Sequence, residues 1–388
     1  MKSNIPKLYI IRAIRWFLLI MPVSVLFFQE NGLTMREVFI LQSIFSIVVV
    51  ILEVPSGYFA DVFGRKNAII IGSFFAFLGF LTFSFSYGFW GFLLAESLLG
   101  FGSSFVSGAD SAFLYDTLVD LKESDKYSRI EGKYSAIGNF SESTAAIIGG
   151  FLASISLRYP FYIETIILLF AVPIALTLRE PKRHKLKTTD GNLRSILRLT
   201  KYALHDHKEI KWLIIYSSLV QAGGLVMVWM IQPYFSFVGL PLVFFGLAWA
   251  CLNFSTGVFS IYAYKFERFF GRTNSLFSLV ILLFIGFMSL SVIKSLWGIG
   301  LIFIFYFVRG INEPVLKDYI NQLIGSDIRA TVLSVKQLMG RMIFTIIGPF
   351  IGWINDLYTL QVALFMTGII FFVPGLVSLF FLRKVKVV

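Results

Sequence analysis

The stretch GYFADVFGRK, residues 57–66, separates two long apolar runs and contains one acidic and two basic side chains. Gly57 and Gly64 lack a Cβ, which permits close approach between helices and a tight turn. Asp61 precedes the two basic residues by four and five positions, so the charges gather at one end of the apolar runs. The stretch therefore predicts a short, charged turn between two apolar helices.

A weaker copy of this stretch lies in the second half of the chain. Residues 59–67 align with residues 266–274, with five of nine positions identical. A second match, in the same order along the chain, pairs residues 135–151 with residues 334–350. Two matches in corresponding places indicate a duplicated chain. Duplicated six-helix halves form many secondary transporters, with the site near the bilayer midplane between them.

The composition excludes most soluble classes. Of the 388 residues, 57% are hydrophobic and 14% are charged, against about 25% charged in an ordinary soluble domain. One cysteine excludes a disulfide scaffold and a Cys-based metal cluster. The formal net charge of +12 does not indicate nucleic-acid binding, because the basic residues lie between apolar runs and not in one basic domain. The composition indicates an integral membrane protein.

Twelve apolar runs are long enough to cross a bilayer, which takes about 20 residues of helix. Barrel strands would be shorter and would alternate in polarity. The fold class we predict is an all-α integral membrane protein with twelve transmembrane helices arranged as two pseudo-symmetric six-helix halves. The runs are 8–28, 37–59, 68–87, 90–114, 134–157, 160–178, 212–235, 242–264, 275–293, 297–319, 333–354 and 361–382.

The distribution of basic residues predicts the orientation. With the N-terminus inside, 25 of the 34 Lys and Arg residues fall in cytoplasmic segments and three in outer loops, as the positive-inside rule requires. Both termini are then cytoplasmic. The longest polar stretch, 179–211, is predicted to link an N-terminal half, 1–178, to a C-terminal half, 212–388. From Asn192 this linker is amphipathic, which fits either a helix on the inner membrane surface or a solvated basic loop.

Residues 57–66 resemble the signature loop between helices 2 and 3 of the major facilitator superfamily, Gly-x-x-x-Asp-(Arg/Lys)-x-Gly-Arg-(Arg/Lys), with Val62 at the usual basic position. The resemblance implies a latch that stabilises the outward-facing state, in which Asp61 faces the start of helix 11 near Lys336. Arg65 then meets Asp116 or Asp120. The alternative is an ordinary short turn with positive-inside charges. The residues of the expected latch are Gly57, Asp61, Gly64, Arg65, Lys66 and Asp116.

Ionisable residues inside the apolar runs are the candidate transport residues, because a charge at mid-bilayer costs several kcal/mol unless it faces protein or water. Polar residues from Glu96 to Asp110 recur at steps of three and four, which predicts one polar face of a continuous helix. Glu164 lies near the outer end of its run and is expected to be interfacial. The residues assigned to proton coupling or the substrate cavity are Arg12, Arg15, Glu53, Asp110, Glu142, Arg309, Glu313, Arg341 and Asn312.

Structural alternatives remain open for these charges. Arg12 and Arg15 lie near a cytoplasmic end and are able to snorkel to the interface. Glu142 and Arg341 occupy equivalent repeat positions and are able to form a purely structural ion pair. Arg309 and the residue four positions later, Glu313, are able to pair along one helix.

The sequence predicts a secondary active transporter that moves a small organic solute by alternating access. A buried carboxylate, Glu142 or Glu53, that pairs alternately with an arginine and a proton would couple the two movements. Proton-coupled efflux is the first hypothesis. Proton-driven uptake of an organic anion and, in a different class, a transport-dead receptor or scaffold are the alternatives.

The chain carries no sequence signature of an enzyme. All three His lie in the linker, the single Cys is Cys251, and neither a zinc-protease helix motif nor a phosphate-binding loop occurs. We therefore expect no catalytic residue, no metal and no cofactor. The expected partners are a small solute, protons and the lipid bilayer, with no nucleic acid. The expected state is a monomer with many spans in the cell membrane.

Overall fold

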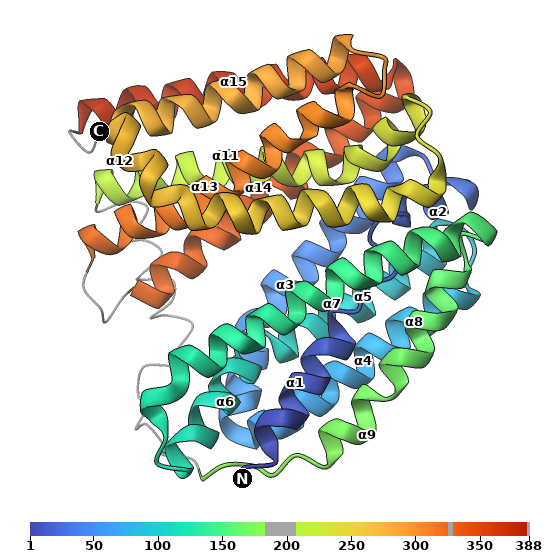
Figure 1. Cartoon of the computed structure of the whole chain (residues 1–388), viewed down its shortest axis with the longest axis vertical. Helices are drawn as coiled ribbons and strands as arrows, with labels where there is room; N and C mark the ends of the chain where they lie inside the picture. The colour runs from blue at the N-terminus through green and yellow to red at the C-terminus, as the bar shows by residue number, and fades with distance from the viewer. Residues whose placement is uncertain (183–206, 325–328, 386–388) are drawn as a thin grey trace. The chain divides into compact units, whose positions relative to one another are not determined.

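The computed structural model describes residues 1–182, 207–324 and 329–385, and within these ranges every regular element is a helix (Figure 1). The amphipathic segment predicted from Asn192 lies outside the described residues. The chain divides into two compact units. Unit 1 comprises Met1–Leu33, the described part of Ile44–Thr189, and Leu242–Ala250; unit 2 comprises Thr34–Ser43, Cys251–Val388 and the described part of Asp190–Pro241.

Nine helices in the described ranges are long and apolar enough to cross a membrane, one of which, Leu242–Val292, contains two of the predicted spans. Two predicted spans are not among them: 134–157, and 8–28, which is split into two short helices. An all-helical membrane fold is therefore observed. The arrangement of twelve spans in two six-helix halves is consistent with it and stays a prediction.

In unit 1, the helices α4 (Arg65–Phe85) and α5 (Gly88–Val106) pack tightly against each other. Gly72 and Gly102 face each other, and a Cβ on Gly72 would lie 2.7 Å from the carbonyl oxygen of Gly102. Small residues at this contact allow the two backbones to approach closely. The helices of the unit are α1 (Asn4–Arg15), α2 (Ser24–Glu30), most of α3 (Met35–Phe63), α4 (Arg65–Phe85), α5 (Gly88–Val106), α6 (Ala109–Asp120), η1 (Ser124–Lys126), α7 (Tyr127–Ile155), α8 (Tyr159–Leu169) and α9 (Ala171–Leu176).

Three of the predicted spans in unit 1 are interrupted. The run 8–28 forms α1 and α2, separated by residues 16–23. Pro22 has no N–H to continue the helix there. The run 90–114 breaks between α5 and α6, where Gly108 has a φ of 76°. The prediction of one continuous polar helix face from Glu96 to Asp110 was therefore wrong. The run 160–178 breaks at Phe170 between α8 and α9, three residues before Pro173.

Unit 2 packs around α11 (Lys208–Phe237), which contacts α13 (Gly298–Leu323), α14 (Arg329–Leu357) and α15 (Leu360–Lys384). Most of the long helix α12 (Phe245–Val292) also belongs to unit 2, and its two arms meet at Gly271, where φ is 72°. Figure 1 shows these arms joined at the turn. The turn is the copy of Gly64, which also has a positive φ, 116°. Both repeats therefore use glycine for the same reason, a backbone conformation that other residues adopt at a cost.

The units differ from the expected halves in two short segments. Thr34–Ser43, at the start of α3, belongs to unit 2, where the backbone N–H groups of Met35 and Arg36 donate to the Asp356 carboxylate at 2.9 and 2.8 Å. The segment Leu242–Ala250, which includes η3 (Leu242–Phe244), belongs to unit 1. There Gly246 packs against α7, and a Cβ on Gly150 would lie 2.7 Å from the Gly246 nitrogen.

Candidate functional site

A polar pocket of about 300 Å³ lies in unit 1, where two interrupted helices meet. Interrupted membrane helices mark the substrate sites of many transporters, because the unwound backbone and the new helix ends offer polar groups in an apolar surrounding. One wall comes from α1 and the start of its interruption, one from the break between α5 and α6, and one from α7. The lining residues are Arg12, Arg15, Trp16, Ser103, Val106, Ser107, Gly108, Asp110, Ser111, Glu131 and Tyr134.

Arg12 lies between two aromatic rings in this pocket. Its guanidinium carbon is 4.4 Å from the centre of the Trp16 ring and 4.7 Å from that of Tyr134. A cation over an aromatic face is attracted by about 0.5–2 kcal/mol. The absence of a side chain at Gly138 leaves room for this arginine, since a Cβ there would lie 2.7 Å from Arg12 Nε. That Nε has no hydrogen-bond partner among the described residues.

Asp110 is the anionic partner of Arg12. Its Oδ2 lies 3.7 Å from Arg12 Nη1 and accepts a hydrogen bond of 2.8 Å from the Tyr134 hydroxyl. Its Oδ1 accepts from the backbone N–H of Ser111 at 2.8 Å. Asp110 stands in the first turn of α6, where the helix dipole favours a negative charge. Arg15 lines the same pocket, so two of the predicted cations and one predicted carboxylate are brought together.

A second carboxylate in the pocket, Glu131, was missed by the sequence reasoning. The Ser111 hydroxyl donates to Glu131 Oε1 at 2.8 Å, while Oε2 has no partner within the described residues. Hydropathy placed Glu131 in a loop, but α7 begins at Tyr127, before the apolar run. The signal was present, because Glu131 precedes Glu142 by eleven residues, three turns of one helix face. Burial and the nearby Glu131 raise the pKa of the Tyr127 hydroxyl.

The charged turn between α3 and α4 contains the contact that the family resemblance implied. Arg65 donates to Asp116 of α6 and, at 2.6 Å, to the carbonyl of Ala112. The N-terminus of α4 is capped by Glu180, a residue that the sequence reasoning did not select. Its two carboxylate oxygens accept from the backbone N–H groups of Arg65 and Lys66 at 3.0 and 2.8 Å. The role of this cluster as a latch stays a prediction.

Two glycines of the turn have different surroundings. Gly64 has a φ of 116° and forms the tight turn, as expected. A Cβ on Gly57 would meet no atom within 4 Å. The expectation that Gly57 permits close approach between helices stays a prediction. Asp61 lies on α3, and its predicted position near the start of α14 stays a prediction.

In unit 2, Lys336 of α14 is almost fully buried and its Nζ bonds to Glu313 of α13 at 2.9 Å. Glu313 is thus paired between helices, whereas the sequence suggested Arg309, four residues earlier, as its partner. Arg309 is exposed on α13, and no side-chain polar contact of it is found in the described part of the chain. Asn312 is buried, and its Oδ1 has no partner among the described residues.

The remaining predicted residues lie on three helices. Glu53 is exposed on α3, in the part that belongs to unit 1. Glu142 is half-buried on α7 in unit 1, and Arg341 is half-buried on α14 in unit 2. Each of the last two has polar or electrostatic interactions. Their assignment to proton coupling stays a prediction.

Glu164 is not interfacial, and that expectation was wrong. Its side chain on α8 is 1% exposed, and its Oε2 accepts from the backbone N–H of Ile20 at 3.3 Å. The interruption between α1 and α2 frees this N–H from helical pairing, and the carboxyl group takes it up. Hydropathy alone places a residue at a depth in the membrane and does not reveal whether it faces lipid or protein.

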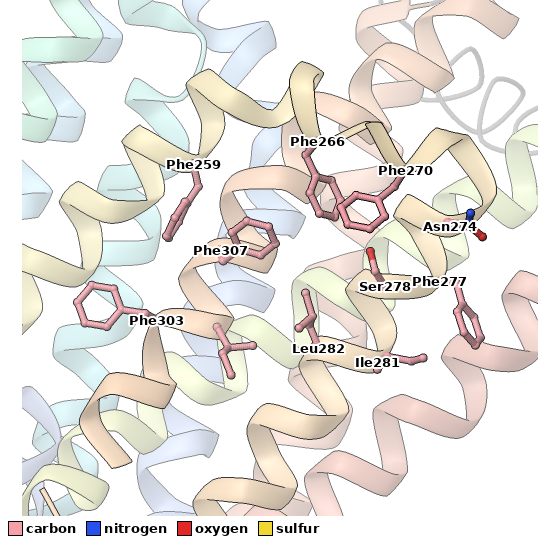
Figure 2. Close-up of a pocket in the computed structure, with 11 residues that line it drawn as sticks. Phe259, Phe266, Phe270, Asn274, Phe277, Ser278, Ile281, Leu282, Phe303 and Phe307 are labelled. Atoms are coloured by element: carbon pink, nitrogen blue, oxygen red, sulfur yellow. The ribbon is translucent and has the colours of Figure 1, made fainter. Parts of the chain in front are cut away.

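Unit 2 has an apolar groove of about 740 Å³ between the two arms of α12 and α13. Figure 2 shows its phenylalanine rings, with Phe266 and Phe270 side by side. Their centroids are 4.8 Å apart, and Phe307 lies 5.4 Å from Phe266. The lining residues of this groove include no ionisable side chain. Of the two cavities, only the pocket in unit 1 therefore has groups that are able to exchange a proton.

The model of the Major Facilitator Superfamily matches residues 8–349. The chain therefore belongs to this superfamily, whose members are transporters and not enzymes. Its fold is that of a membrane transporter, and the general class of function is secondary transport.

Three proteins illustrate what the chain is similar to. It is 22% identical to the uncharacterised MFS-type transporter YxaM of Bacillus subtilis (strain 168), over 94% of this chain and 92% of that one. Multidrug resistance protein 1 of the same organism is 30% identical over 43% of this chain and 42% of its own length. The crystal structure of the nucleoside transporter NupG superposes with a TM-score of 0.82 at 15% identity, covering 98% of both chains, a likeness of fold alone.

Proposed function

We propose that this protein is a proton-coupled exporter of small amphipathic organic compounds in the cell membrane, working as a monomer by alternating access. The observation that carries the proposal is the Arg12–Asp110–Tyr134 cluster, because it joins an ion pair to two aromatic rings in a pocket at two helix interruptions. The partial likeness to a protein named for multidrug resistance supports export of an organic compound.

Asp110 is the coupling carboxylate in this proposal. In its ionised form it holds Arg12 by charge and accepts from Tyr134. When it takes up a proton, the attraction for Arg12 is lost and the guanidinium is free to turn toward another partner. A cationic compound that binds between the Trp16 and Tyr134 rings takes the place of the Arg12 guanidinium beside ionised Asp110. Protonation of Asp110 removes the attraction for that cation, so proton and compound are bound in alternation, which is the requirement for antiport.

The charged turn between α3 and α4 serves as the latch of the cycle. The Arg65–Asp116 ion pair and the Glu180 cap tie α4 to α6 and to the chain that follows α9. The Arg65–Asp116 ion pair is a side-chain contact that water is able to replace at low cost, since both side chains are only partly buried. It therefore suits a contact that forms and breaks in each cycle. In this proposal the latch stabilises the outward-facing state.

One observation favours a second candidate function, proton-driven uptake of an organic anion. The pocket holds two arginines, and Arg12 Nε has no acceptor among the described residues. A carboxylate on a solute would satisfy it with a charge-assisted hydrogen bond. Under this alternative Arg12 binds the solute, and the proton neutralises Asp110 so that the guanidinium becomes available.

The test uses purified protein in proteoliposomes that enclose a pH-sensitive dye. A panel of lipophilic cations, antibiotics and organic acids is added to wild type, to Asp110→Asn and to the control Asp125→Asn, which removes an exposed carboxylate outside the pocket. We expect a compound to trigger proton movement in wild type and in the control and none in Asp110→Asn. Response to lipophilic cations supports export, and response to organic acids supports uptake. Equal proton movement in Asp110→Asn would contradict the proposal.

A further inference from the structure

The interruption of the first span, residues 16–23, holds a buried carboxyl group against its backbone. Leu19 and Ile20 are buried there, and the Ile20 N–H donates to Glu164 Oε2. On the other side Gly149 of α7 packs against this segment, and a Cβ at Gly149 would overlap the Leu19 carbonyl oxygen. The unwound segment is therefore clamped between α7 and α8, and Glu164 is the acidic residue in contact with it.

The second oxygen of Glu164 has no partner. Oε1 is buried and makes no hydrogen bond within the described residues. No basic side chain in the described part of the chain forms an ion pair with this carboxyl group. A buried polar atom without a partner requires an explanation, since the large majority of buried side-chain polar atoms in folded proteins are hydrogen-bonded.

The groups on the surrounding elements do not supply a countercharge. On α4, Ser84 shares a hydrogen bond with Thr165, the neighbour of Glu164. On α7, Glu142 lies seven residues before Gly149, two turns away on the same face. At the start of α8, the N-cap residue Arg158 donates to the carbonyls of Ser84 and Ser86 and to Asn31 Oδ1.

The end of α1 does not supply a countercharge for Glu164 either. Arg15 ends α1, one residue before the interruption, and lines the pocket with Asp110. It forms no ion pair with Glu164 among the described residues. The hydrogen-bond donors that reach Glu164 from this side, among the described residues, are thus the neutral peptide N–H groups of Ile20 and Leu19.

We propose that Glu164 is a proton-binding site, in which the proton resides on Oε1 and Oε2 accepts from the Ile20 amide. An isolated carboxylate inside a membrane protein costs several kcal/mol, whereas the neutral acid removes the buried charge and still accepts the hydrogen bond observed at Oε2. Binding adds one proton to the carboxylate and requires no other reactant. The site is separate from the pocket, and its occupancy does not depend on the proposed transport function.

Because Glu164 contacts the interruption of the first span, loss of its proton would change the interactions of that segment. Loss of the proton would place a full negative charge against Ile20, four residues along the chain from Trp16, which begins the interruption and lines the pocket. The charge would strengthen the bond to the Ile20 amide, because hydrogen bonds to ionised acceptors are roughly twice as strong as neutral ones. The ionised carboxylate would also be stabilised by a nearby positive charge. Arg15, the last residue of α1, is the basic residue next to the interruption.

The test is infrared spectroscopy of the purified full-length protein at neutral pH. The difference spectrum of wild type minus Glu164→Gln should contain the carbonyl stretching band of one neutral carboxylic acid. The matched control, Glu30→Gln, removes an exposed glutamate at the end of α2, and its difference spectrum should contain the bands of an ionised carboxylate. Because the readout needs no transported compound, it is independent of the transport assays.

Two further results complete the test. Glutamine imitates the neutral acid, so Glu164→Gln should unfold at the same temperature as wild type; should it fail to fold, Glu164→Asp keeps the acid and should shift the band without removing it. Ionised-carboxylate bands for Glu164 at neutral pH would overturn the proposal. A band that disappears on addition of sodium at constant pH would also overturn it, since the site would then bind a metal cation.

Discussion

The ion pair in the pocket predicts a measurable coupling between Arg12 and Asp110. The perturbation is a double-mutant cycle with Arg12→Gln, Asp110→Asn and the double variant. At the observed 3.7 Å, two unit charges attract by about 4–5 kcal/mol at an effective dielectric constant of about 20. The side chains are only 18% and 12% exposed, so screening by water is limited, but desolvation opposes the attraction. We therefore expect a coupling energy of about 1–3 kcal/mol.

The assay is reversible unfolding of the purified protein in mixed detergent micelles, with a second cycle as the control. Lys126 and Glu123 form an ion pair of 3.2 Å whose side chains are 53% and 34% exposed. Exposed pairs of this kind contribute about 0.2–1 kcal/mol. The shorter pair should thus couple more weakly than the longer one, because burial outweighs the difference in distance. A coupling energy for Arg12 and Asp110 no larger than that of the control pair would refute the reasoning.

Three other substitutions test separate parts of the structure. Gly149→Ala should destabilise the protein by about 1–3 kcal/mol in a thermal unfolding assay, because its Cβ would overlap the Leu19 carbonyl oxygen. The control, Gly132→Ala, lies on the same helix with open space around it and should be neutral or slightly stabilising. Glu180→Gln should cost about 0.5–2 kcal/mol, since it weakens the cap on the two N–H groups at the start of α4; unchanged unfolding would show that the cap is replaceable by water. Glu142→Gln should abolish uphill transport and spare exchange of solute, and full uphill transport by this variant would remove Glu142 from the coupling mechanism.

The membrane class and the charged turn were accessible from the sequence because they depend on local features. Apolar runs of about 20 residues need a bilayer whatever their neighbours are. The Gly64 turn depends on a backbone conformation that glycine favours, and its copy at Gly271 follows the same rule. The contact of Arg65 with Asp116 followed from the family resemblance and could not be deduced from spacing alone.

The interrupted helices were not accessible in the same way. Hydropathy is an average over a window and remains high across a break. Pro22 and Pro173 were the available signals, because each removes a backbone donor. The break at Gly108 has a weaker signal, since glycine is also common within membrane helices. The misplacement of Glu164 follows directly, because its contact with Ile20 exists only where the first span is unwound.

Glu131 and Tyr134 illustrate a different limit. Both belong to the pocket, yet one lay in a predicted loop and the other at the first position of a predicted span. Membrane helices extend beyond their apolar part, and the extension is polar because it leaves the hydrocarbon. When the helix is extended toward its N-terminus, both residues lie on the side that carries Glu142. The helical period was therefore a better guide to the residues of the pocket than the boundary of the apolar run.

The central claim is that the pocket couples the movement of a proton to the movement of an organic solute. The most direct measurement is accumulation of a labelled compound from the panel in proteoliposomes with an imposed pH gradient, for wild type and Asp110→Asn. The account predicts uphill accumulation by wild type that collapses with the gradient, and exchange without accumulation in Asp110→Asn. Accumulation by wild type that is unaffected by the gradient, or equal accumulation by Asp110→Asn, would contradict it.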